Sequence, residues 1–310
     1  MSNHHPRPWL AAVLSLFFGP LGFLYAGRLV FAILFFFLTL GIRILAFVTS
    51  GGVSLFASIA ELACWLGGAM LAWYLAKQRP AREPRWYSRW YGMAGVALAL
   101  AACVYLTRLF FYEPFLVPSS AMLPTASRGD RLLVKKLGYG HLSINTLALG
   151  RMPASSPLAR GELVVFEDPV KRGQIGFKRI AGVGGDEVAV RGGRLVVNGR
   201  DTRIAELGVY RGAGSQGAQV EYLRMRERLG DAVFETLVQK QGPAPLEEPL
   251  AFPMRERCSF TREAMRCTVP PGYLFVLGDH RDFSQDSRYY GFVRSDQVIG
   301  KVVGTYPGGD

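Results

Sequence analysis

Apolar residues dominate the first third of the chain and alternate with polar residues in the rest. Four apolar runs precede residue 112, and each is near the ~20 residues that a helix needs to cross a bilayer core. They cover about 9–25, 29–47, 53–75 and 91–106, and Gly19-Pro20 interrupts the first, short run. This pattern predicts a membrane anchor of three or four transmembrane helices within residues 1–111.

Short runs of alternating apolar and polar residues, separated by glycine, follow the anchor. Examples are RLLVKK at 131–136, ELVVFED at 162–168 and YLFVLGD at 273–279. A period of two indicates strands with one buried face. We therefore expect residues 112–310 to form a mainly β, antiparallel outer domain with barrel-like or sandwich-like closure. A polar stretch at about 201–265 is interpreted as an insertion beside the core sheet, in which 218–237 shows no clear period.

Basic residues predict the orientation of the chain in the membrane. Segment 77–89 carries five Lys or Arg residues against a single Glu83, so the positive-inside rule keeps it in the cytoplasm. The last span then leaves the cytoplasm, which makes the protein multi-pass in the plasma (inner) membrane and places 112–310 on the extracytoplasmic, periplasmic side. The net charge of +12 comes without a nucleic-acid motif, and it favours the anionic lipid bilayer over nucleic acid as a partner.

Two of the four cysteines, Cys258 and Cys267, lie close together in the outer domain. An oxidising compartment permits a disulfide between them, and the alternative is two free thiols on a surface loop. The chain has no Cys-x-x-Cys pair and no His/Cys cluster, so we expect no zinc site.

Two bases accompany the hydroxyl-rich stretch 117–136. His280 lies in GDHRDFSQDSRYYGFV, where nearby carboxylates suggest either a metal-hydrolase site or an internal salt-bridge network; the adjacent arginines disfavour a cation. Lys178 is flanked by Phe177 and Ile180. A desolvated lysine has a lowered pKa and acts as the base in Ser-Lys hydrolases, whereas the alternative is an ordinary solvated charge.

Long boxes in the outer domain resemble those of the type I signal peptidases. PSSAMLPT with GDRLLVKK (118–136) is similar to the nucleophile box of that family, and FKRIAGVGGDEV (177–188) to its lysine box. GDHRDFSQDSRYYGFV (278–293) resembles the C-terminal box, and RGELVVFEDP (160–169) a supporting strand. The resemblance implies a serine endopeptidase that removes signal peptides from secretory preproteins, with no metal or organic cofactor.

The resemblance also implies a role for each matching residue. Lys178 becomes the general base, Ser119 helps to hold the oxyanion, and Ser284 orients the lysine. The others are a supporting ion pair of Asp286 and Arg288, a loop opened by Gly278 and Asp279, and Met122 lining the substrate groove.

Ala121 departs from the family pattern, because the family has its nucleophilic serine at this position. A methyl group cannot form an acyl-enzyme, so this chain should be impaired in catalysis. If 119–122 is extended, Ser119 and Ala121 share a face and Ser120 points away from Lys178, so that only a local turn would let Ser120 attack. Three explanations stay open: a deliberate substitution, a natural relative that binds preproteins without cutting them, or an unorthodox hydroxyl.

Overall fold

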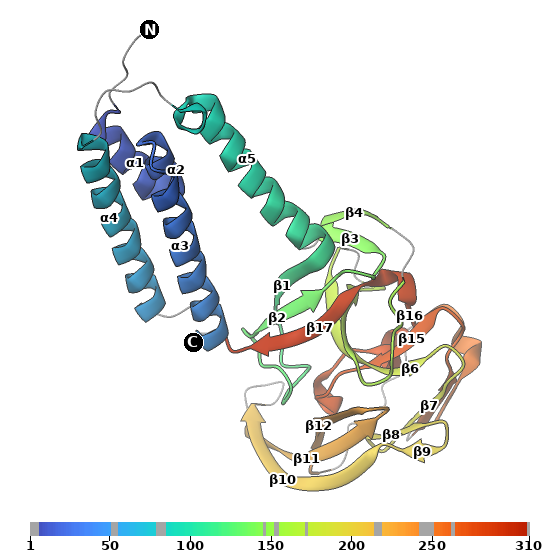
Figure 1. The fold of residues 1–310 in the computed structure, drawn as a ribbon. Helices are drawn as coiled ribbons and strands as arrows, with labels where there is room; N and C mark the ends of the chain where they lie inside the picture. The colour runs from blue at the N-terminus through green and yellow to red at the C-terminus, as the bar shows by residue number, and fades with distance from the viewer. Residues whose placement is uncertain are drawn as a thin grey trace. The chain divides into compact units, whose positions relative to one another are not determined.

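The computed structural model describes residues 6–50, 55–78, 85–144, 147–151, 155–170, 173–213, 219–241, 251–261 and 264–308. It divides the chain into two compact units, Met1–Thr107 with Tyr306–Asp310, and Arg108–Thr305 (Figure 1). Residues 79–84 of the predicted basic loop lie outside the described residues. So do 214–218, 242–250 and 262–263 of the expected insertion.

The first unit is helical. It contains α1 (Pro8–Phe18), α2 (Pro20–Tyr25), α3 (Leu29–Ser50), α4 (Leu55–Lys77), η1 (Trp86–Ser88) and α5 (Trp90–Leu106), which continues into η2 (Thr107–Phe111). Among the described residues, three segments are long and apolar enough to cross a membrane: Leu29–Ala46, Ser58–Lys77 and Trp90–Phe111. The first apolar run instead forms two short helices, because Gly19 adopts a positive φ of 55° and Pro20 starts a new helix.

A seven-stranded sheet is the centre of the second unit, in the order β1-β2-β17-β5-β6-β15-β16. These strands are β1 (Tyr112–Leu116), β2 (Arg131–Lys135), β17 (Val298–Tyr306), β5 (Leu163–Glu167), β6 (Ile175–Val183), β15 (Tyr273–Leu277) and β16 (Val293–Arg294). The pairings β1–β2, β17–β5, β5–β6, β6–β15 and β15–β16 are antiparallel. The prediction of a mainly antiparallel β domain together with apolar N-terminal helices is confirmed.

Smaller sheets complete this unit. One contains β13 (Cys258–Phe260), β14 (Ala264–Thr268), β7 (Glu187–Arg191), β8 (Arg194–Val197) and β9 (Arg200–Asp201), and a hairpin pairs β3 (His141–Ile144) with β4 (Leu147–Arg151). The third sheet is β10 (Arg203–Ala213), β11 (Gln219–Leu229) and β12 (Ala232–Gln239), here called the β10–β12 sheet. Cys258 and Cys267 face each other across β13 and β14 and form a disulfide.

Alternation along β5 and β6 separates two apolar clusters on opposite faces of the seven-stranded sheet. Val165 and Phe177 pack in one cluster, and Val164 and Ile180 in the other. Lys178 is the cross-strand partner of Val164, so it extends from the face that carries Ile180. The strand thus places an ionisable side chain over an apolar surface. Short connectors finish the unit: η3 (Arg255–Arg257), η4 (Arg281–Phe283), α6 (Ser287–Tyr290) and η5 (Ser295–Gln297).

Candidate active site

The segment with Ala121 is a turn between β1 and β2, so the condition of the alternation argument, an extended 119–122, is not met. The Leu123 N–H donates to the Ser120 carbonyl at 3.2 Å, and the Ala126 N–H donates to the Met122 carbonyl at 3.0 Å. Such local hydrogen bonds compete with an extended conformation. The alternation argument against Ser120 therefore loses its premise, and Ser120 stays an open alternative that mutation must test.

Met122 does not line an open groove in this structure, which corrects the role that the resemblance implies. Its side chain is only 1% exposed and packs in the cluster with Val117, Val134 and Ile299. The turn directs Met122 into the core. Ser119 is exposed and Ser120 is half-buried.

Ala121 is held by the loop that begins at Gly278. The His280 N–H donates to the Ala121 carbonyl at 3.1 Å. A Cβ atom added to Gly278 would lie 2.7 Å from that carbonyl oxygen and would also collide with the Ser284 hydroxyl. Only glycine fits at 278 without a shift, so position 121 and Ser284 converge on the same point.

Lys178 is buried next to this point, on β6. In the antiparallel pairing of β15 with β6, Leu277 lies opposite Arg179. Gly278, the next residue after β15, therefore lies opposite Lys178. Burial lowers the pKa of Lys178, and the charge of Arg288 lowers it further, while Asp286 and Asp279 oppose the shift only in part. Within the described residues, Lys178 forms no ion pair with a carboxylate. The amine is therefore suited to accept a proton.

Two buried ion pairs hold the loop 278–288. Arg179 donates to both carboxylate oxygens of Asp279, at 2.8 and 2.6 Å. Arg288 donates to both oxygens of Asp286, at 2.8 and 2.9 Å, and the Gly278 N–H also donates to Asp286. Burial would raise the pKa of Asp286, but Arg288 and these hydrogen bonds outweigh burial and lower it. The loop is rigidly braced as a result.

Sequence reasoning missed Arg179 and Thr125 as members of this bracing. The Thr125 hydroxyl donates to Asp279, which connects the turn of Ala121 to the loop. The Arg179 guanidinium also stacks over the Phe234 ring at 3.9 Å from its centroid. Because neighbouring residues on a strand point to opposite faces, β6 places Lys178 on one face of the sheet and Arg179 on the other. The adjacency of Lys178 and Arg179 in one box was the available signal.

Several polar groups around Ala121 lack protein partners in the described part of the chain. The Ser284 hydroxyl is buried and unpaired, although the resemblance would have it orient Lys178. The Ser119 hydroxyl and the Ala121 N–H donate to no described residue. Buried polar groups are normally satisfied, so an unpaired group beside a buried lysine indicates a site that awaits a ligand.

The carboxylates around His280 form a salt-bridge network. Asp279 and Asp286 are engaged by arginines, and Asp282 accepts from the Gln239 N–H at 2.6 Å. His280 places Nδ1 3.2 Å from the Ser120 carbonyl oxygen. In the regions that the structure describes, no three metal-ligand side chains form a group that could hold an ion.

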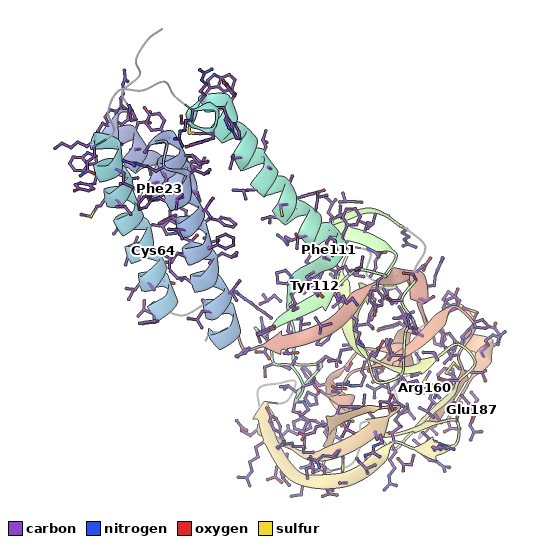
Figure 2. The ribbon with its side chains drawn as sticks, viewed as in Figure 1. Phe23, Cys64, Phe111, Tyr112, Arg160 and Glu187 are labelled. Atoms are coloured by element: carbon purple, nitrogen blue, oxygen red, sulfur yellow. A yellow bond between two sulfur atoms is a disulfide. The ribbon has the colours of Figure 1, made fainter. Side chains whose placement is uncertain are left out.

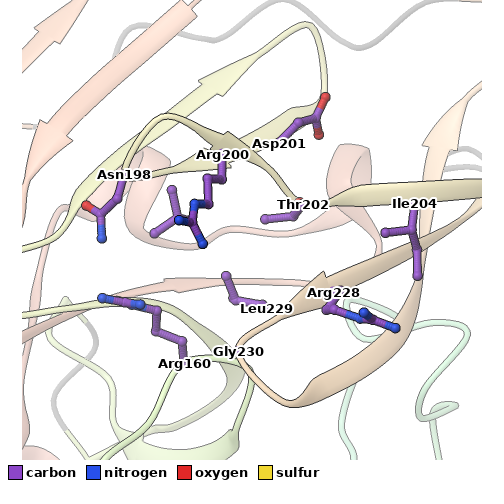
Figure 3. A pocket seen from close by; sticks show the side chains of 10 residues that line it. Arg160, Asn198, Arg200, Asp201, Thr202, Ile204, Arg228, Leu229 and Gly230 are labelled. Atoms are coloured by element: carbon purple, nitrogen blue, oxygen red, sulfur yellow. The ribbon is translucent and has the colours of Figure 1, made fainter.

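A cavity of about 570 Å³ lies elsewhere in the unit, between β8, β9 and the β10–β12 sheet (Figure 3). Arg160, Arg200 and Arg228 line it together with Thr202 and Leu229. Arg160 is already paired with Asp186. None of the lining residues belongs to the cluster around Ala121, so we do not assign this cavity to the candidate active site.

Replacing Lys178 by methionine should stabilise the protein at neutral pH, because the unfolded chain no longer gives up a proton on folding. Between the lowered pKa of folded Lys178 and its ordinary value of 10.5, the free energy of unfolding of the original chain rises by about 1.4 kcal/mol per pH unit. The advantage of Lys178→Met should therefore shrink as the pH rises toward 10.5. Thermal unfolding in detergent at several pH values measures this.

Lys301→Met is the control for that experiment, since Lys301 is partly exposed and pairs with Glu162. It should bring no comparable gain. An unchanged pH slope in Lys178→Met would mean that Lys178 is not neutral in the folded protein.

A buried lysine beside a hydroxyl that has no partner among the described residues is the arrangement expected of a Ser/Lys peptidase. The chain belongs to the family described as "Signal peptidase, peptidase S26", whose model matches residues 88–306. It is 33% identical over 210 residues to signal peptidase I of Pseudomonas aeruginosa, covering 64% of this chain and 66% of that protein. It is 30% identical over 230 residues to signal peptidase I of Bacillus caldolyticus, covering 74% and 92%.

Among solved structures, the chain is similar to a signal peptidase I of Enterococcus faecalis. The identity is 28%, and the match covers 48% of this chain and 98% of that one. The TM-score is 0.27, which is too low for this likeness to support a conclusion about the fold or the function.

Proposed function

We propose that this protein is a signal peptidase I of the plasma membrane, whose Ser/Lys chemistry operates when residue 121 is serine. The observation that carries the proposal is the buried, unpaired Lys178 beside the loop that contacts position 121. Family membership adds to it. The substrates are secretory preproteins, cut at an extended segment with small residues of the A-x-A kind.

The chemistry is set by the positions of these groups. A serine hydroxyl at 121 loses its proton to neutral Lys178 as it attacks the carbonyl carbon of the scissile bond. The 121 N–H and the Ser119 hydroxyl then donate to the developing oxyanion. The unpaired Ser284 hydroxyl is the group that orients Lys178, and the Asp286–Arg288 pair holds the loop in place.

An edge of β6 supports binding of the substrate as an added strand. β15 ends opposite Arg179, whereas β6 extends to Ile175 and, among the described strands, pairs there only with β5. Residues 175–178 therefore leave one side of the backbone without a β15 partner. A peptide in extended conformation adds to such an edge through main-chain hydrogen bonds.

Exposed apolar residues at the start of the β unit support an active site close to lipid. Phe111 and Tyr112, labelled in Figure 2, are exposed on or next to β1, and Leu116 at the end of this strand is exposed too. Aromatic and apolar side chains of this kind favour the membrane interface. We place this unit on the extracytoplasmic side, where signal peptides leave the membrane.

A second function, in which the chain binds signal peptides without cutting them, is favoured by Ala121 itself. Both functions predict that the chain as written captures a preprotein. Cross-linking in detergent should recover a preprotein with alanine at the two small-residue positions of its cleavage segment. Tyrosine at both positions should abolish capture, because a site that selects small residues of the A-x-A kind has no room for its ring. Equal capture of the two preproteins would contradict substrate recognition at this site.

A further inference from the structure

A buried carboxylate in the β10–β12 sheet connects that sheet to the loop 278–288. Glu227 on β11 is 1% exposed and accepts hydrogen bonds from three different segments. The Thr202 hydroxyl donates at 2.9 Å, the Thr236 hydroxyl of β12 at 2.8 Å, and the Arg281 guanidinium at 2.8 Å. Arg281 is itself 2% exposed and belongs to η4, inside the loop. The Glu227 carboxylate therefore joins the β10–β12 sheet to the loop 278–288.

From Arg281 the connection continues to the candidate active site. The Arg281 carbonyl accepts from Arg288 at 2.6 Å, and Arg288 pairs with Asp286. Asp286 accepts from the Gly278 N–H at 2.9 Å. Gly278 is the residue at which any side chain would collide with the Ala121 carbonyl and the Ser284 hydroxyl. A series of buried contacts thus connects Glu227, through Arg281, Arg288 and Asp286, to Gly278 beside Ala121 and Ser284.

Further contacts join the same two parts. The Leu237 N–H of β12 donates to the Asp279 carbonyl at 2.9 Å, and Leu237 forms a parallel bridge with His280. The Tyr222 ring of β11 meets the His280 imidazole edge-on, with 4.6 Å between ring centroids. His280 in turn donates its N–H to Ala121. In Figure 1 these strands form a sheet of their own beside the rest of the β unit.

We propose that the β10–β12 sheet is a positioning element for the loop 278–288, and that Glu227 is its main positioning residue, acting through Arg281. The effect on catalysis rests on the proposed function, whereas the effect on the loop does not. An ion pair suits this task because its geometry is directional. Apolar side chains of similar volume would stabilise the fold as well, but they would not fix the direction of the loop.

The experiment compares an all-apolar cluster with a matched control. The variant Glu227→Met/Thr236→Val/Arg281→Met removes the ion pair without leaving either charge unpaired, so we expect its melting temperature to stay near that of the parent. The control Thr236→Val removes one hydroxyl from the same cluster and leaves Glu227 bonded to Arg281. Both are made in the full-length chain in detergent.

The first measurement is hydrogen exchange of the peptide 278–283, in which the amides of Gly278, His280 and Phe283 are hydrogen-bonded. Exchange should be at least tenfold faster in the all-apolar variant and unchanged in Thr236→Val. Should the all-apolar variant fail to fold, Glu227→Gln keeps the shape of the side chain and should show a smaller change in the same direction. Unchanged exchange in the folded variant, or an equal change in Thr236→Val, would overturn the proposal.

The second measurement is cleavage in the Ala121→Ser background. We expect the all-apolar variant to lower kcat at least tenfold with KM changed less than twofold, because substrate still binds while the loop is misplaced. A parent-like kcat would overturn the positioning role in catalysis. If Ala121→Ser itself does not cleave, the proposed function fails, and hydrogen exchange still decides whether Glu227 positions the loop.

Discussion

Ala121→Ser should switch on cleavage of a secretory preprotein, with a gain on the order of 10⁶-fold, the factor typical of a catalytic nucleophile. The site needs little else. Position 121 is 6% exposed, its carbonyl is held by His280, and its N–H is unused by the described residues. A serine hydroxyl adds one oxygen to the methyl group, at a place where the neighbouring Ser284 hydroxyl is also unpaired. Gel analysis and mass spectrometry of a preprotein with an A-x-A segment would measure the rate and the cleavage position.

Two further variants test whether the gain depends on the proposed base. Ala121→Ser/Lys178→Ala should return to the baseline, since no other described base takes the place of Lys178. The rate of Ala121→Ser should rise as the pH rises through the lowered pKa of Lys178, because only the neutral amine accepts the proton. Cleavage that survives loss of Lys178 would refute the Ser/Lys assignment. Cleavage by the chain as written that disappears in Ser120→Ala would show that Ser120 attacks instead.

Asp286→Ala should destabilise the β unit by about 3–5 kcal/mol, because it leaves the Arg288 charge buried without its partner. Asp286 is fully buried and accepts from Arg288 and from the Gly278 N–H. The folded pKa of Asp286 is lowered, so the stability that its charge contributes is present above the unfolded pKa and is lost as the pH falls through the folded value. The difference between variant and parent should shrink in acid. Denaturant or thermal unfolding in detergent measures both effects.

Asp296→Ala is the comparison for that prediction. Like Asp286, Asp296 pairs with an arginine two positions away, Arg294, but here both side chains are exposed to solvent. Its removal should change the melting temperature little. Equal losses in the two variants would mean that burial of the Asp286–Arg288 pair has no special weight.

Much of the fold could be predicted from local patterns. The runs 29–47, 53–75 and 91–106 overlap the three membrane-length segments of the described residues, because a span needs only continuous apolar length. The strands at 131–135, 163–167 and 273–277 match alternations visible in the sequence. The segment 218–237 was not predicted as strand, although its described residues include all of β11 and most of β12. The charged Glu227 occupies one of the buried positions of β11, so the apolar residues of this segment do not repeat with a clear period of two.

The candidate site was predicted less completely. The boxes that resemble the family pointed to Lys178, Ser284, Asp286 and Arg288, and these lie around one loop. The turn at 119–122 and the burial of Met122 could not be read from the sequence, since both depend on how one short segment packs. Thr125 and Asp279 are 154 positions apart, and no local period connects them.

The resemblance of its box to the family singled out Lys178. Residue type and spacing were sufficient for the apolar helices and for the strand-rich second unit. These properties depend on neighbours a few positions away. Folding in three dimensions decided that Lys178 is desolvated, that Gly278 brings position 121 and Ser284 together, and that Glu227 reaches Arg281. Each of these requires contact between segments far apart in the chain, where burial and mutual geometry set the charge state and direction of a side chain.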